Sequence, residues 1–181
     1  MVMSHRRFWL SGSTRLNELR PERRGCLSRV PLQNDKNRGG LTEAMVREIV
    51  RDTALLRQPS LTATRKDGKA ADDLLATLKA HAADCVGMAA NMIGITKRIV
   101  AVRTGQAYLL LLNPVIMARS PETYLAEEGC LSLDGVRPVR RHAWIEVTYC
   151  DWKFKRKQQR FTGLAAQIVQ HEMDHLEGIL I

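Results

Sequence analysis

The chain has 181 residues, of which 45% are apolar and 26% charged, a composition typical of a folded domain with its own hydrophobic core. No uninterrupted apolar run approaches the roughly 20 residues that a membrane-spanning helix needs, which excludes a protein built on transmembrane helices. The net charge of +9 would suit a polyanion-binding protein, but residues 1–44 alone hold nine Lys and Arg against four acids.

Residues 1–44 are predicted to form a basic, disordered leader, because they are rich in Arg, Ser and Gly and lack apolar periodicity. A transit peptide, an upstream extension of the reading frame and a genuine basic tail all fit this composition. The lack of a clear amphipathic helix favours an extension or a tail. We expect the folded catalytic domain to span residues 45–181. The four cysteines are widely spaced without a C-x-x-C pair, which indicates reduced thiols and a cytoplasmic location.

Short strands and one helix are predicted in the first two thirds of the folded domain. Residues 70–83 carry three leucines at helical spacing after early acids, which predicts an amphipathic helix. Strands are predicted at residues 98–102, 108–112, 144–149 and 153–161. Gly105 and the pair at 151–152 are expected to form turns between them.

A second helix is predicted to begin at Gly163. Its apolar positions are Leu164, Ile168, Val169 and Leu176, and Gly178 is the expected C-terminal cap. The fold class that follows is α+β, a largely antiparallel β-sheet packed around this central C-terminal helix.

The C-terminal helix carries the sequence His-Glu-Met-Asp-His at residues 171–175. His171 and His175 are four positions apart and therefore share one helix face, where both imidazoles can reach a single metal ion. Glu172 can then act on a water as a general base without being a ligand. The alternative is a solvated helix face, which the apolar residues at 168–169 disfavour.

A third ligand must come from upstream, because only six residues follow His175 and none of them can complete the site. The best candidate is Cys130, which follows a strand-like run and stands between a glycine and Leu131-Ser132. A Cys-His-His set leaves a fourth position open for water, as catalytic sites do. By itself Cys130 would be interpreted as a small buried apolar residue. A zinc endopeptidase is a weaker alternative, since such enzymes take their third ligand from downstream.

These residues carry a specific resemblance. Residues 128–132 (EGCLS) and 170–178 (QHEMDHLEG) resemble two signature motifs of peptide deformylases, and residues 85–92 (CVGMAANM) resemble the third, G-x-G-x-A-A-x-Q. All three occur in the family's order and spacing, and the resemblance covers about residues 45–181. It implies removal of the formyl group from the N-terminal N-formyl-methionine of new polypeptides, with Fe(II) expected and Zn, Ni or Co as alternatives.

The resemblance also implies a role for several individual residues. Cys130, His171 and His175 would be the metal ligands, and Glu172 would take a proton from water and return it to the leaving amine. The backbone N–H of Leu131 would donate to the developing oxyanion. The resemblance further implies that Gly87 lines the strand along which the substrate peptide adds, and that Arg137 braces the metal loop together with Glu128.

Two positions depart from the third motif. Cys85 replaces its first glycine, which we expect to be tolerated. Met92 replaces its glutamine, whose amide would donate to the formyl oxygen, and a thioether cannot donate a hydrogen bond. The loss of one oxyanion donor typically costs about 10²–10³ in rate. Three interpretations therefore stay open: a slow deformylase, an amidase acting on another N-acyl group, or a protein that only binds N-terminal peptides.

The expected partners are N-formyl-Met peptides and nascent chains, with no membrane and no specific DNA binding. A basic cluster at residues 153–160 could also attract RNA, as on the ribosome, although a solvated hairpin is the simpler interpretation.

Overall fold

The structure, a computed structural model, describes residues 43–181. The predicted leader at 1–44 therefore lies outside the described residues, apart from its last two positions. Within residues 43–181 no helix is long and apolar enough to cross a membrane.

In residues 43–181, two α-helices, two 3-10 turns and one strand precede six consecutive strands, and a third α-helix follows them. The helices are α1 (Thr53–Leu56), the 3-10 turn η2 (Arg65–Asp67), α2 (Gly68–Ala80), the 3-10 turn η3 (Ala90–Ile93) and α3 (Gly163–Leu176). The strands are β1 (Gly87–Ala89), β2 (Ile99–Thr104), β3 (Ala107–Arg119), β4 (Thr123–Cys130), β5 (Leu133–His142), β6 (Trp144–Cys150) and β7 (Arg156–Thr162).

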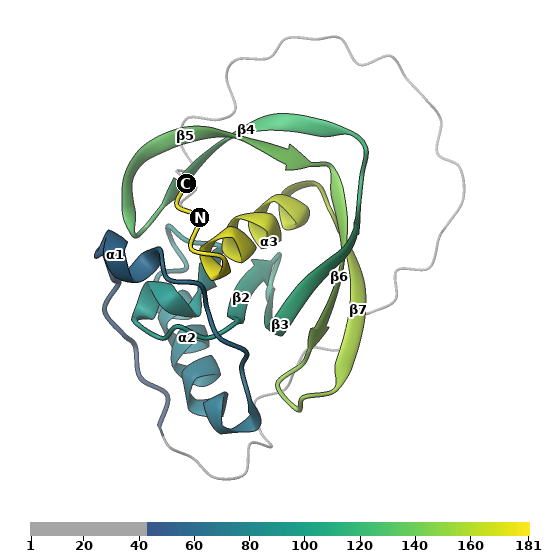
Figure 1. The fold of residues 1–181 in the computed structure, drawn as a ribbon. Helices are drawn as coiled ribbons and strands as arrows, with labels where there is room; N and C mark the ends of the chain where they lie inside the picture. Colours follow the sequence, from purple (N-terminus) through teal and green to yellow (C-terminus); the bar gives the residue numbers. More distant parts are fainter. Residues whose placement is uncertain (1–42) are drawn as a thin grey trace. The chain divides into compact units, whose positions relative to one another are not determined.

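The strands form a five-stranded sheet in the order β1-β2-β3-β6-β7 and a separate two-stranded sheet of β4 and β5. Every paired strand is antiparallel to its neighbour. In Figure 1 the strands curve around α3, and β4 and β5 arch over it. The predicted α+β architecture around a central C-terminal helix is therefore confirmed.

The predicted elements differ from the observed ones mainly in length. The helix expected at 70–83 is α2, and β3 is much longer than the strand expected at 108–112. The last strand begins at Arg156 rather than at residue 153, because Asp151 Oδ1 accepts from the N–H groups of Lys153 and Lys155, both at 2.9 Å, and holds this stretch as a turn. The strand-like run expected before Cys130 is β4, whereas β5 was not expected.

Helix α3 is buried over most of its length, and Ile168, Val169 and Leu176 lie in the core as expected. The expectation for Leu164 was wrong: it is 49% exposed, because it sits in the first turn at the rim of the sheet. Gly178 (φ +72) ends the helix as predicted. The N–H groups of Gly178 and Ile179 donate to the carbonyls of His175 and Asp174, which is a Schellman cap.

Candidate metal centre

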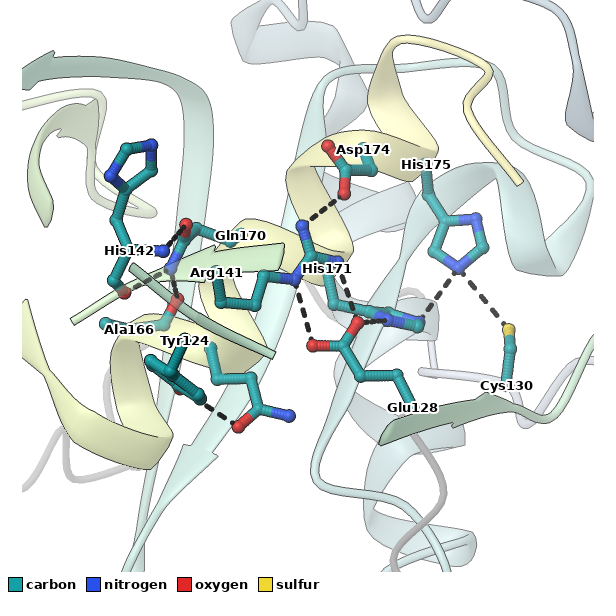
Figure 2. A network of polar contacts seen from close by, with 11 residues as sticks. Tyr124, Glu128, Cys130, Arg141, His142, Ala166, Gln170, His171, Asp174 and His175 are labelled. Atoms are coloured by element: carbon teal, nitrogen blue, oxygen red, sulfur yellow. Dashed lines mark hydrogen bonds and ion pairs between the residues drawn. The ribbon is translucent and has the colours of Figure 1, made fainter. Parts of the chain in front are cut away.

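One thiol and two imidazoles converge inside the fold. Cys130 is the last residue of β4, and His171 and His175 face it from α3 (Figure 2). Cys130 Sγ lies 3.3 Å from His175 Nε2, which lies 3.3 Å from His171 Nε2. A register shift between Gly129 and Cys130 ends the regular pairing of β4 with β5, a local irregularity that can redirect a side chain. All three residues are buried.

The three donor atoms fit a single transition-metal ion. They lie within 4.8 Å of one another. Metal–nitrogen bonds of about 2.0–2.1 Å at tetrahedral angles separate two ligand nitrogens by roughly 3.3 Å, which matches the imidazole pair. A thiolate with two imidazoles leaves one of four positions for a water or a substrate oxygen. This donor set is that of a catalytic metal site.

Cys130 is prepared to act as a thiolate. Burial by itself would raise its pKa, but hydrogen bonds from His171 and His175 outweigh burial and lower the pKa of Cys130 to about 5. The thiolate is the form that binds metals, so this cysteine is in its ligating state at neutral pH.

His171 is oriented by a buried ion-pair network. Its Nδ1 lies 2.8 Å from Glu128 Oε2, and Arg141 donates to both carboxylate oxygens of Glu128 at 2.9 and 2.7 Å (Figure 2). Burial opposes the ionisation of Glu128, but Arg141 and His171 overcome it and lower the pKa of this carboxyl to about 2. Because an ionised carboxylate only accepts, Nδ1 of His171 donates and Nε2 is directed toward Cys130 and His175.

Arg141 also links this network to the helix itself, through a 2.6 Å ion pair between its Nη1 and Asp174 Oδ2. The assignment of this bracing role to Arg137 was therefore wrong. Arg137 pairs with Glu128 in the strand register, yet its side chain is exposed. Arg141 lies four residues further along the same face of β5, where α3 covers the strand, and it is the arginine that reaches the buried carboxylate.

Further polar contacts fix α3 against the two-stranded sheet. The Gln170 side chain accepts from the His142 N–H and donates to the His142 carbonyl, each at 3.0 Å. The Tyr124 hydroxyl donates to Gln167 Oε1 at 3.1 Å. The Gln170 amide thus bonds the main chain of β5 as a neighbouring strand would. These contacts fix the position of α3, which carries both histidines, relative to the two-stranded sheet, whose β4 carries Cys130.

Glu172 lies between α3 and β1. The side chain is fully buried. A Cβ atom built on Gly87 would lie only 2.6 Å from Glu172 Oε1 and 2.6 Å from Ile168 Cγ2. Gly87 is therefore required here by the close approach of strand and helix rather than by its backbone angle. β1 is an edge strand of the five-stranded sheet.

The other residues singled out from the sequence are Leu131, Met92 and Cys85. Leu131 occupies the turn between β4 and β5, where the Ser132 N–H donates to Cys130 Sγ at 3.4 Å. Met92 is completely buried in η3. Cys85 is accommodated at its motif position without a left-handed backbone, and its thiol donates to the Gly87 carbonyl at 2.8 Å.

Three functional residues escaped the sequence analysis: Arg141, Asp174 and Asn91. Asn91 Nδ2 donates to the carbonyl of His175 at 2.7 Å. Asp174 lies three positions after His171 and therefore on the same face of α3. This spacing is a sequence signal that both side chains could contact the same neighbouring network. The contacts of Arg141 and Asn91 join distant parts of the chain, and no local pattern marks them.

The fold and this centre define a hydrolase of the H-E-x-x-H kind whose third donor is a cysteine from upstream. A family model described as polypeptide deformylase matches residues 46–181. A peptide deformylase from Clostridium beijerinckii is 49% identical over 137 residues, which cover 76% of this chain and all of the relative. A second, from Synechocystis, is 36% identical over 70% of this chain and 71% of its own length.

Solved structures agree with the sequence relatives. The peptide deformylase of Thermotoga maritima superposes with a TM-score of 0.69 at 32% identity, covering 76% of this chain and 95% of the other. A class I type b peptide deformylase from Acinetobacter baumannii, solved with Met-Ala-Ser bound, gives a TM-score of 0.70 at 29% identity, covering 76% and 97%. The chain belongs to the polypeptide deformylase family and is an amide hydrolase, as its motifs predict.

Proposed function

We propose that this protein removes the formyl group from the N-terminal N-formyl-methionine of newly made polypeptides. The observation that carries the proposal is the convergence of Cys130, His171 and His175 around one point, with Glu172 beside them. The Acinetobacter baumannii neighbour with Met-Ala-Ser bound supports an N-terminal methionine peptide as the ligand class. The proposed location is cytoplasmic, which the widely spaced cysteines without a C-x-x-C pair support.

One divalent ion held by Cys130, His171 and His175 completes the proposed site, with Fe(II) as the expected metal. The same donors accept Zn, Ni or Co, so ligand type alone does not select among them. When bound, such an ion supplies Lewis acidity and makes a coordinated water more acidic.

The residues of the chain perform the proton transfers and hold the substrate. Glu172 takes a proton from the attacking water and returns it to the amine as the formyl C–N bond breaks, so that water is divided between formate and the new N-terminus. The N–H of Leu131, in the turn next to Cys130, donates to the oxyanion. Gly87 lies on the edge strand β1, where an extended peptide can add as a further strand.

Met92 weakens this machinery in our proposal, because the second oxyanion donor is missing. The test is formate release from a formyl-Met tripeptide by the full chain, loaded with Fe(II) without oxygen, beside the Met92→Gln variant. We expect a slow wild type and a gain of about tenfold or more in the variant. A wild-type rate equal to that of a deformylase with the complete motif would contradict the role of Met92.

The same experiment distinguishes the alternatives. No formate from either protein, with one equivalent of metal bound, would reject the deformylase proposal. A screen of other N-acyl peptides would then separate an amidase of different acyl preference from a non-catalytic binder of N-terminal peptides.

The catalytic domain is proposed to span residues 45–181, with 1–44 as a leader outside it. The main chain is already packed at its start, since the Met45 N–H donates to Asp73 Oδ1 at 2.8 Å. Asp73 is almost inaccessible to solvent and also pairs with Arg47 and Lys69. This cluster attaches the first residues of the domain to α2.

Ribosome association is a second proposal, carried by the hairpin between β6 and β7. Lys153, Lys155 and Arg156 are exposed there, and none has an ion pair among the described residues. Arg65 extends the basic surface, since its guanidinium lies 5.4 Å from the Phe154 ring centroid. Salt-dependent RNA binding that falls in Lys155→Glu/Arg156→Glu would support the proposal. Binding unchanged by this substitution would assign it to the leader instead.

A further inference from the structure

The two histidines of the candidate metal centre are supported in different ways. His171 has Glu128 on its Nδ1 at 2.8 Å. Nδ1 of His175 is buried and has no hydrogen-bond partner within residues 43–181. Metal-ligating histidines almost always donate from the second ring nitrogen to a partner that fixes the ring. Within residues 43–181 the polar contacts of the His175 ring are therefore those of Nε2, and the main chain that carries the ring is the other element that can fix its position.

Asn91 holds the main chain of His175. The side chain of Asn91 is completely buried, and its Nδ2 donates to the His175 carbonyl at 2.7 Å and to the Leu56 carbonyl at 3.3 Å. Two carbonyl acceptors fix the orientation of the amide, because only its nitrogen can donate to both. One bridge thus joins α1, η3 and the last turn of α3.

The Asn91 amide bonds a carbonyl at the C-terminal end of α3. His175 is in the last turn of α3, where carbonyls lack helical N–H partners. The Gly178 N–H reaches the same carbonyl at 3.2 Å from the cap, and the Asn91 amide reaches it from the protein interior at 2.7 Å. The last turn, with the His175 ring on it, is thereby held from both sides.

We propose that Asn91 is a positioning residue for the metal centre: by holding the His175 carbonyl it places the His175 imidazole against Cys130 and His171. The inference rests on the metal site proposed above. In this proposal the third motif contacts the metal centre through Asn91, independently of the neighbouring Met92. Outer-shell partners of metal ligands typically contribute about 10- to 100-fold in metal affinity.

The test uses the full chain loaded with Co(II), whose visible absorption reports the geometry of a thiolate–imidazole site. Asn91→Asp keeps the shape of the side chain but removes both N–H donors, and Asn91→Ala serves as a neutral second variant. Asn113→Asp is the control, since Asn113 also binds main chain through its amide, accepting from the Ala63 N–H at 2.7 Å and donating to the Ala63 carbonyl at 2.9 Å, without contacting a ligand.

We expect the Asn91 variants to show an altered Co(II) spectrum and to release the metal to a chelator about tenfold faster or more. Asn113→Asp should lower the melting temperature while leaving both readouts at wild-type values. Folded Asn91 variants with wild-type spectrum and release rate would overturn the inference and leave Asn91 as a helix cap only. A wild type that takes up no metal would instead reject the proposed metal site itself.

Discussion

The two sides of the candidate metal centre are built by different physical means. On the side of β4 and β5, charged side chains position the ligand: Glu128, Arg141 and Asp174 form a chain of ion pairs that ends on His171. On the side of β1 and η3, close packing and main-chain contacts replace charge, with Gly87 against Glu172 and Asn91 on the carbonyl of the second histidine.

The two departures from the family motif lie on one of these sides only. A buried charge that loses its partner is strongly destabilising, so the charged side tolerates little change. Both motif departures, Cys85 and Met92, lie on the packed side, where both side chains are buried and the Cys85 thiol donates to the Gly87 carbonyl. In the proposed mechanism, a substitution such as Met92 changes the stabilisation of the transition state without replacing any metal ligand.

The largest effect is expected at Glu172, which belongs to both sides because it follows His171 and rests against Gly87. Glu172→Gln keeps the shape of the side chain and removes its ability to accept and return a proton. We expect formate release to fall by about 10²–10⁴ with an unchanged metal content. A variant that keeps more than a tenth of the wild-type rate would exclude Glu172 as the acid/base.

The next effect tests the charged side. Arg141→Met leaves the Glu128 carboxylate buried without its bidentate partner, and we expect a loss of about 3–5 kcal/mol in the free energy of unfolding, measured by urea denaturation. Arg137→Met is the control, because the Arg137 side chain is exposed and its replacement should change this energy by no more than about 0.5 kcal/mol. Equal losses in the two variants would contradict the assignment of the bracing role to Arg141.

The same contrast shows what the sequence could predict. Helix α3, its cap and the three converging donors were predictable, because helical spacing and the motifs are local signals. β5 was not, and β4 was indicated only as a strand-like run before Cys130, since the face they present to α3 carries Glu128 and Arg141 rather than alternating apolar residues. The bond from Asn91 to His175 spans 84 positions, so only the folded chain brings the two residues together.

The smallest of these effects tests the packed side. In Gly87→Ala the new methyl group would lie 2.6 Å from both Glu172 Oε1 and Ile168 Cγ2, so the Glu172 carboxylate must shift or the strand and helix must separate. A displacement of about 1 Å at a catalytic group can cost about 10²-fold in rate. We therefore expect kcat to fall by roughly tenfold to a hundredfold, with full metal content, since no metal ligand is touched.

Gly68→Ala is the matched control for this substitution, because no atom lies within 4 Å of the Cβ position at Gly68 and the rate should not change. A fall in metal content in Gly87→Ala would mean that β1 supports the ligands as well as the acid/base. The separation of the two sides would then fail. A fall in kcat alone would assign β1 to Glu172, and β1 would be the place to alter activity without disturbing the metal, whereas η3 supports the ligand His175 through Asn91.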